Sequence, residues 1–168
     1  MIPVATGGVG KSVRRKEDAR FLTGRGEFVA DIKRFGMREV AFLRSPVAHG
    51  RITRIGKPAD TAGDVYVASD LDGVSAIRAD SSLPGFKSSL QPILATGKVR
   101  YVGDQVAVVI ADTYSQAKDA AESIVVDYEI LPAAVSMSDA LTDKALVHDD
   151  IGSNLCFDWE IGDEAAVD

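Results

Sequence analysis

The stretch of residues 91–132 constrains the fold most, because it predicts a strand, a helix and a second strand in direct succession. Residues 106–111 (VAVVIA) are apolar without alternation, which is typical of a strand covered on both faces. Residues 124–129 are rich in β-branched and aromatic strand formers. We therefore expect a β-α-β unit at 105–129, in which strands 105–111 and 124–129 are parallel neighbours joined by a right-handed crossover.

The helix between these strands carries its own start signal. Thr113 and Gln116 have the spacing of a capping box, in which each side chain bonds to the other residue's backbone N–H. Behind them, small or apolar residues recur at helical spacing and predict one buried stripe: Ala117, Ala120, Ala121 and Ile124. The pattern predicts a helix over 114–123 whose alanines pack closely across the sheet.

Just before this unit, Val99 and Tyr101 alternate with Lys98 and Arg100, which predicts a strand with one buried and one wet face. A turn or bulge is expected at 103–104, where Gly and Asp interrupt the pattern.

The rest of the chain predicts short elements. Further strands are expected at 27–32, 39–44, 51–55, 65–67 and 74–77, with one more beginning at 157–161. Ser136 and Asp139 form a second capping pair, which predicts a short helix through Leu141.

Composition excludes several classes of protein. The longest apolar runs are about six residues, far short of the ~20 that a membrane helix needs, so no membrane span is expected. The first residues show no basic region followed by an apolar block, which predicts no secretory signal. A single cysteine, Cys156, favours a reducing, cytoplasmic compartment.

Charge is unevenly distributed. Residues 1–57 hold 13 Lys and Arg against 5 Asp and Glu, whereas the rest of the chain holds 6 against 20. The basic residues are interleaved with acids and lack an accompanying set of aromatic residues, so no nucleic-acid partner is expected. A contact between oppositely charged domains or subunits is the favoured interpretation.

Residues 5–12 (ATGGVGKS) fit the loose form of a phosphate-binding loop, and 106–112 could supply the strand ending in a metal-binding Asp. A P-loop nucleotide hydrolase is therefore one alternative. Its loop needs a buried strand before it and a core helix after it, yet only four residues precede this one and mostly charged residues follow. We expect Lys11 and Ser12 to lie in a glycine-rich arm, outside any phosphate nest.

The histidines suggest no catalytic or metal site. His49 lies beside Gly50 between two predicted strands, which favours a hydrogen-bonded turn residue. Residues 148–150 (His-Asp-Asp) lack the rest of a coordination sphere, so a solvated loop is expected. The residues themselves predict no catalytic, cofactor-binding or metal-binding position in this chain.

Three stretches resemble the beginning of the molybdenum hydroxylase large subunit, the family of xanthine dehydrogenase, aldehyde oxidase and aerobic carbon monoxide dehydrogenase. They are RRKEDARFLTGRGEFVADI (14–32), FLRSPVAHGRI (42–52) and VRYVGDQVAVVIADTYSQAKDAAESIVVDYEILPA (99–133). The closing FDWEIGD (157–163) is similar to the family's continuation past its first domain, and the resemblance is weakest over 56–90.

The resemblance implies an α+β fold, the α/β-hammerhead, with a mixed sheet and two helices. It implies an N-terminal arm at 1–23, the hammerhead domain at 24–145, and a linker at 146–168 toward a molybdopterin-binding domain. The family's catalytic glutamate and cofactor loops match no position here, so the resemblance implies no cofactor in this chain. It implies molybdopterin in the complete large subunit, and iron–sulfur clusters and FAD on partner subunits.

The implied function is that of a structural domain in an enzyme that oxidises an aldehyde, a heteroaromatic ring or carbon monoxide. The chain itself would be inactive, either as part of a longer subunit or as a split-gene subunit. The remaining alternatives are the P-loop hydrolase and a free-standing interaction module.

Overall fold

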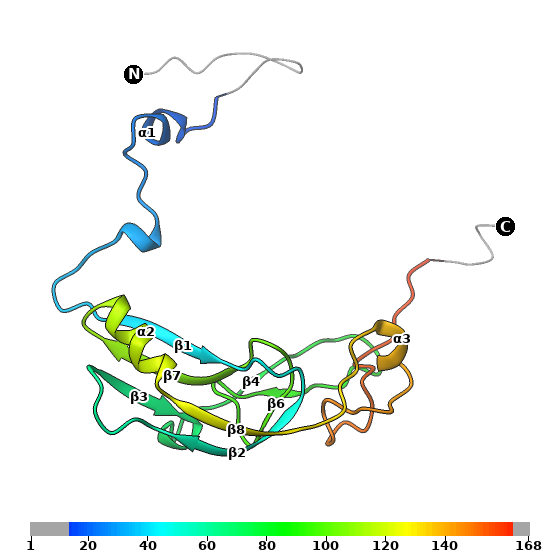
Figure 1. The fold of residues 1–168 in the computed structure, drawn as a ribbon. Helices are drawn as coiled ribbons and strands as arrows, with labels where there is room; N and C mark the ends of the chain where they lie inside the picture. The colour runs from blue at the N-terminus through cyan, green and yellow to red at the C-terminus, as the bar shows by residue number, and fades with distance from the viewer. Residues whose placement is uncertain (1–13, 163–168) are drawn as a thin grey trace. The chain divides into compact units, whose positions relative to one another are not determined.

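The structure, a computed structural model, describes residues 14–162 (Figure 1). Contacts divide the chain into two compact units, residues 1–37 and 38–168, and each is described by itself. The glycine-rich motif at 5–12 lies outside the described residues, and so does the expectation for Lys11 and Ser12. Within residues 14–162, no helix is both long and apolar enough to cross a membrane.

The first unit contains one short helix, α1 (Asp18–Leu22), and a compact aromatic turn. The rings of Phe21 and Phe28 stack with their centroids 5.6 Å apart. Gly26 lies between them in the chain, and a Cβ at this position would come within 2.8 Å of the Phe21 ring. Any larger residue here would therefore have to displace the Phe21 ring from its stacked position.

The strand expected at 27–32 is wrong. This stretch forms a 3₁₀ turn, η1 (Val29–Asp31), in the first unit. The Asp31 carboxylate accepts a hydrogen bond from the Phe28 N–H at 2.9 Å, so the segment satisfies a backbone donor locally. No strand among the described residues pairs with it.

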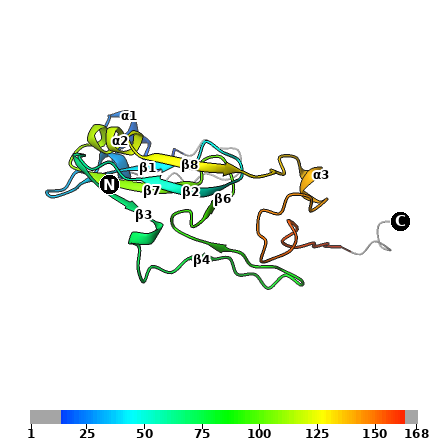
Figure 2. The same cartoon turned by 60° about the horizontal axis from the view of Figure 1, so that its bottom comes forward.

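The second unit is built from two three-stranded antiparallel sheets (Figures 1 and 2). The first has the order β1–β7–β3, made of β1 (Glu39–Arg44), β7 (Gln105–Ala111) and β3 (Gly63–Val67). The second has the order β6–β2–β8, made of β6 (Lys98–Val99), β2 (Gly50–Gly56) and β8 (Val125–Ile130). The remaining short elements are β4 (Ile77–Arg78), β5 (Leu90–Gln91) and η2 (Ala68–Asp70). The predicted α+β class is confirmed.

Several local predictions are confirmed, and two strands are wrong. The strands expected at 39–44, 51–55 and 65–67 are present as β1, β2 and β3. Of the strand expected at 74–77 only Ile77 lies in a strand, β4, because the Val74 N–H bonds to the Leu71 carbonyl in a turn. Residues 157–161 pair with no other strand and are irregular.

The central helix, α2 (Tyr114–Glu122), forms as predicted. The Gln116 N–H donates to the Thr113 hydroxyl, and the Thr113 N–H donates to the Gln116 side chain, which completes the capping box. The predicted stripe is buried against the first sheet, with Ala117, Ala120, Ala121 and Ile124 all at most 6% exposed.

The predicted parallel pairing of strands 105–111 and 124–129 is wrong, although strand, helix and strand do follow one another. β7 is hydrogen-bonded to β1 on one edge and to β3 on the other, both antiparallel. Since both edges are occupied, β8 cannot pair with β7. It pairs instead with β2 in the second sheet.

Two clusters of buried side chains form the core of this unit. One lies between α2 and the first sheet and includes Ala107 and Val109. The other joins Val99 and Val106 to the second sheet. Ile55 and Val126 pack against both clusters, so the two sheets share part of their core.

After β8, the chain forms the short helix α3 (Met137–Ala140), capped as predicted by Ser136, whose hydroxyl accepts from the Asp139 N–H at 3.0 Å. The loop that follows is organised by Asp143 and Asn154. The Asp143 carboxylate accepts the Asn154 N–H at 2.7 Å, and the Asn154 amide donates to two backbone carbonyls.

Candidate functional site

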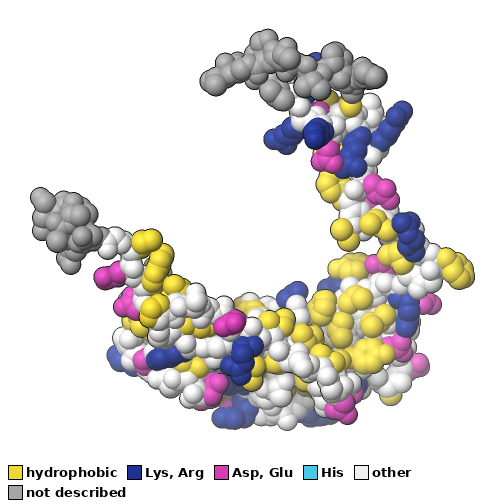
Figure 3. Space-filling model, turned by 180° about the vertical axis from the view of Figure 1, so that it is seen from behind, with side chains coloured by type: hydrophobic (Ala, Val, Ile, Leu, Met, Phe, Trp, Pro, Cys, Tyr) yellow, Lys and Arg dark blue, Asp and Glu magenta, His cyan; other side chains and the backbone are white. Residues whose placement is uncertain are grey.

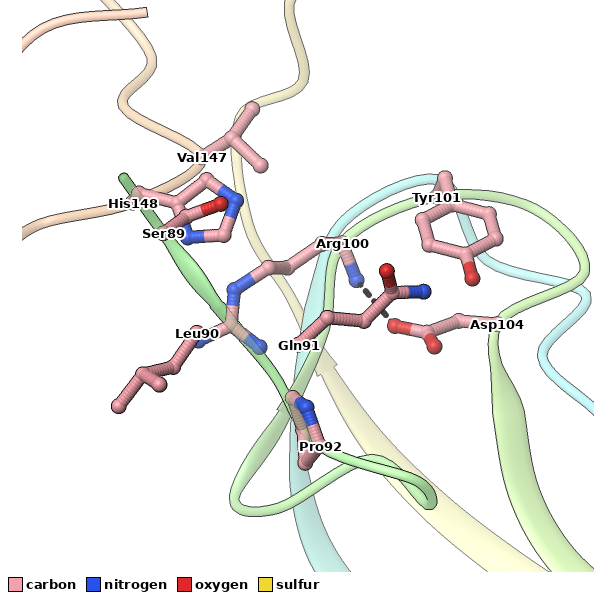
Figure 4. A pocket seen from close by; sticks show the side chains of 9 residues that line it. All are labelled: Ser89, Leu90, Gln91, Pro92, Arg100, Tyr101, Asp104, Val147 and His148. Atoms are coloured by element: carbon pink, nitrogen blue, oxygen red, sulfur yellow. Dashed lines mark hydrogen bonds between the residues drawn. The ribbon is translucent and has the colours of Figure 1, made fainter. Parts of the chain in front are cut away.

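A pocket of about 250 Å³ opens between β5, the turn after β6 and the loop that precedes the C-terminal segment (Figure 4). Two neighbouring parts of the chain, 89–92 and 100–104, meet a third part, 147–148, that is more than forty residues further on. The lining residues are Ser89, Leu90, Gln91, Pro92, Arg100, Tyr101, Asp104, Val147 and His148.

The turn at 101–104 fixes the position of Arg100. The Arg100 N–H donates to the Asp104 carboxylate at 3.0 Å, and Gly103 adopts a positive φ of 95°. The backbone of buried Ser45 holds this turn: its N–H donates to the Asp104 carbonyl, and its carbonyl accepts from the Gly103 N–H, both at 2.8 Å. The expected turn at 103–104 is confirmed.

The Arg100 side chain extends away from the Asp104 carboxylate and into the pocket (Figure 4). Its Nε is fully buried, and among residues 14–162 the guanidinium has neither a hydrogen-bond nor an ion-pair partner. Sequence alternation placed Arg100 on a wet face and Tyr101 on a buried face. The reverse holds: Arg100 is half-buried and Tyr101 is 48% exposed, because β6 ends at Val99 and the turn redirects the chain.

His148 lies on the opposite side of the pocket from the turn. Its burial, with a further contribution from the positive charge of Arg100, holds the pKa of this imidazole below its ordinary value. Beside it, the Asp149 carboxylate pairs with the Lys98 ammonium at 2.7 Å, and this hydrogen bond lowers the pKa of Asp149. The residues of 148–150 thus lie in a loop, as expected, with Asp149 and Asp150 exposed.

His49 is a hydrogen-bonded turn residue, as predicted, and it is also buried at 5% exposure. Its Nδ1 lies 2.6 Å from the Pro132 carbonyl, which can only accept, so Nδ1 carries the proton. The His49 Nε2 has no partner among the described residues.

Other chemistry-bearing side chains lie apart from one another. Asp112, the metal-ligand position of the P-loop alternative, is exposed and lies 3.5 Å from the guanidinium of Arg38. Cys156 is exposed and unbonded. Within residues 14–162, no group of three or more His, Cys, Asp or Glu side chains is placed to hold a metal ion.

Comparison with known families decides the identity of this fold. Residues 23–132 match the model described as "Aldehyde oxidase and xanthine dehydrogenase, a/b hammerhead domain". The chain belongs to this family. The resemblance that the motifs indicated is confirmed, the match to the hammerhead domain begins in the first unit and extends through most of the second, and nothing supports the P-loop alternative.

Similar family members include the carbon monoxide dehydrogenase large chain of Hydrogenophaga pseudoflava, 36% identical over 91% of this chain and 21% of that protein. The crystal structure of quinoline 2-oxidoreductase from Pseudomonas putida 86 is 42% identical, with a TM-score of 0.79 over 86% of this chain and 19% of that one. The structure of a Cu,Mo-CO dehydrogenase is 34% identical, with a TM-score of 0.68 over 82% of this chain and 17% of that one. This chain thus spans about a fifth of the length of these family members.

The signal for the pocket around Arg100 is absent from the sequence. Its lining joins residues 89–92 and 100–104 to residues 147–148, which lie more than forty residues further on, and none of these segments carries a recognisable motif. Only the packed structure shows that the guanidinium lacks an acceptor.

Proposed function

We propose that this chain is a structural domain of the large chain of a molybdenum-dependent oxidoreductase. The complete enzyme would oxidise an aldehyde, a heteroaromatic ring or carbon monoxide, with water as the oxygen source. Support comes from family membership, from the names of the quinoline and carbon monoxide enzymes, and from the molybdenum named in one of those structures.

Molybdopterin would be bound by parts of the complete large chain outside this domain. The pocket around Arg100 does not suit it: 250 Å³ is small for a cofactor, and the Asp104 carboxylate in its lining would repel a phosphate. No catalytic, cofactor-binding or metal-binding role is therefore proposed for any residue of this chain. Iron–sulfur clusters and FAD belong to the proposed partner subunits, in a cytoplasmic enzyme. The proposed division is an arm at 1–23, the hammerhead domain at 24–145 and a linker at 146–168.

One observation carries the structural role. Among residues 38–162, α2 covers one face of the first sheet. The other face is buried at Val106 by the second core cluster, and further along it presents five partly exposed apolar side chains. We call these the outer face: Val40, Phe42, Tyr66, Val108 and Ile110. In Figure 3, hydrophobic side chains gather on the side of this unit that is seen from behind.

The composition of β7 indicates that the outer face is meant to be covered. Its run at 106–111 lacks alternation, which is typical of strands buried on both faces. In the structure Val109 is fully buried under α2, whereas Val108 and Ile110 are only partly buried. Exposed apolar side chains grouped in this way are typical of an interaction site, and Arg44, over the Phe42 ring at 5.6 Å, supplies a charge at its edge.

The proposed occupant of the outer face is the remainder of the large chain. Family members are about five times longer than this chain, since it covers 21% and 19% of two of them. The domain would then brace the longer chain through the outer face, much as packed layers of a larger protein share one core.

The test compares Phe42→Asp with Val125→Asp, which places the same charge on an exposed residue of β8. Each is made in this chain and in the product of the reading frame that continues past Asp168. Both variants of the 168-residue chain should fold, with circular dichroism spectra like the wild type. In the longer chain, Phe42→Asp alone should lower the yield of molybdenum-loaded protein. Equal yields from the two variants, or a reading frame that stops at Asp168, would support the free-standing interaction module instead.

A further inference from the structure

The guanidinium of Arg100 is a partly buried positive charge without an acceptor. No carboxylate, carbonyl or hydroxyl among residues 14–162 bonds to it, and its Nε has no access to water. Arginine cannot shed its proton in a protein, so it cannot escape this cost by becoming neutral. A charge that is partly withdrawn from water is stabilised by an acceptor placed beside it. Lys98, a nearby cation whose side chain is also mostly buried, does form an ion pair, with the Asp149 carboxylate.

The pocket offers further unpaired polar groups around the same space. Ser89, Gln91 and His148 line it, and none of their side chains has a hydrogen-bond partner among the described residues. Each can donate a hydrogen bond to an oxygen atom. With Arg100, they form a set of donors that comes from three separate segments and surrounds one cavity (Figure 4).

The size and charge of the pocket select among anions. A cavity of about 250 Å³ has room for a carboxylate group together with several waters. The Asp104 carboxylate lines the same pocket and repels any anion, but it repels a doubly charged phosphate more strongly than a singly charged carboxylate. A planar, singly charged carboxylate matches the two parallel N–H groups of a guanidinium.

We infer that the pocket lined by Arg100, Ser89, Gln91 and His148 is a carboxylate-binding site. The carboxylate is either a free small molecule or an acidic side chain of the longer large chain. The site itself stands without the proposed function, and only the second source rests on it.

The first experiment is an NMR titration of the 168-residue chain with sodium acetate, against sodium chloride at equal ionic strength. Acetate should shift the Arg100 Nε–H signal saturably and raise the pKa of His148, because a nearby negative charge favours the imidazolium. Arg100→Gln should abolish the response of His148. Arg100→Lys, which keeps the charge but loses the paired N–H groups, should weaken it. Arg54→Gln removes a charge from an arginine with a 72% exposed side chain and should leave it unchanged.

The second experiment distinguishes the two sources by a crystal structure of the longer chain grown without added carboxylates, together with the same titration. A protein-borne partner predicts an Asp or Glu oxygen within hydrogen-bond distance of Arg100 and no response to acetate. A free ligand predicts an open pocket that still responds. The inference is overturned if acetate acts no differently from chloride on the 168-residue chain, or if Arg100→Gln responds like the wild type. If the pocket is empty in the longer chain but the outer face is covered, the protein-borne source is wrong and the proposed function is unaffected.

Discussion

Phe42 on β1 lies directly opposite Val108 on β7, and both side chains project from the face of the sheet that α2 does not cover. The next pair along the same face, Val40 and Ile110, continues this apolar surface across the two strands. The opposite face of the same strands is fully packed, because Ala41 and Val109 face the helix and are at most 3% exposed. One face of this sheet is therefore packed under α2, whereas the other presents partly exposed apolar side chains.

The interface between α2 and the first sheet should not tolerate a charged side chain. Ala120→Glu places an unpaired carboxylate between α2 and the sheet, where Ala120 is 4% exposed. We expect a loss of about 3–5 kcal/mol in the free energy of unfolding, because a buried charge without a partner is costly. Thermal and urea denaturation measure it. Ser115→Glu, on the exposed first turn of the same helix, is the matched control and should leave the melting temperature nearly unchanged.

The capping box should stabilise α2 measurably. Thr113→Ala removes the hydroxyl that accepts the Gln116 N–H, and we expect a loss of about 1 kcal/mol. Ser115→Ala lies two residues further on, is exposed and removes a hydroxyl without a hydrogen-bond partner. Urea denaturation of both variants separates the effect of the cap from that of helix propensity. Equal stabilities would show that the cap contributes nothing.

His148 should titrate below the range of an exposed histidine. Its pKa is lowered first by burial and then by the charge of Arg100. Because the folded state binds this proton less tightly than the unfolded state, His148 favours folding above its ordinary pKa of about 6.5, and this contribution is lost as the pH falls toward the folded-state value. An NMR titration of the histidine ring signals measures the midpoint. Arg100→Gln should move it upward, and a midpoint that does not move would remove Arg100 as a cause.

The 168-residue chain should be catalytically silent. It offers no cluster of metal-binding side chains within residues 14–162, and molybdenum chemistry needs a cofactor held at many points with a base placed beside it. We expect no stoichiometric molybdenum by metal analysis and no dye reduction with aldehydes, purines or carbon monoxide. About one molybdenum per chain, together with turnover, would contradict this and place an active site in the domain.

Local chemistry was predictable from the sequence, and pairing between distant segments was not. The capping box at Thr113 and the alanine stripe of α2 depend on neighbours within one or two helical turns, so spacing alone identifies them. The position of β7 between β1 and β3 depends on partners that are 40 (Val67 with Ala107) to 72 (Glu39 with Ala111) residues away in sequence, and β8 is excluded because these two strands occupy both edges of β7.

The outer face and the pocket around Arg100 illustrate the same difference. The unbroken apolar run of β7 predicted that both of its faces are covered, whereas within residues 38–162 Val108 and Ile110 are only partly buried. Arg100 read as a surface residue, because alternation cannot show that the strand ends one residue earlier. The missing acceptor is a property of the packed pocket alone.

Ile55 and Val126 contact both core clusters, so neither sheet has a hydrophobic core that is independent of the other. Unfolding of the second sheet would remove these two side chains from the packing beneath α2. Unfolding of the first sheet would likewise remove packing contacts from around Val99. The two sheets should therefore melt together in a single cooperative transition, and a strain applied at one end of the domain would be felt at the other.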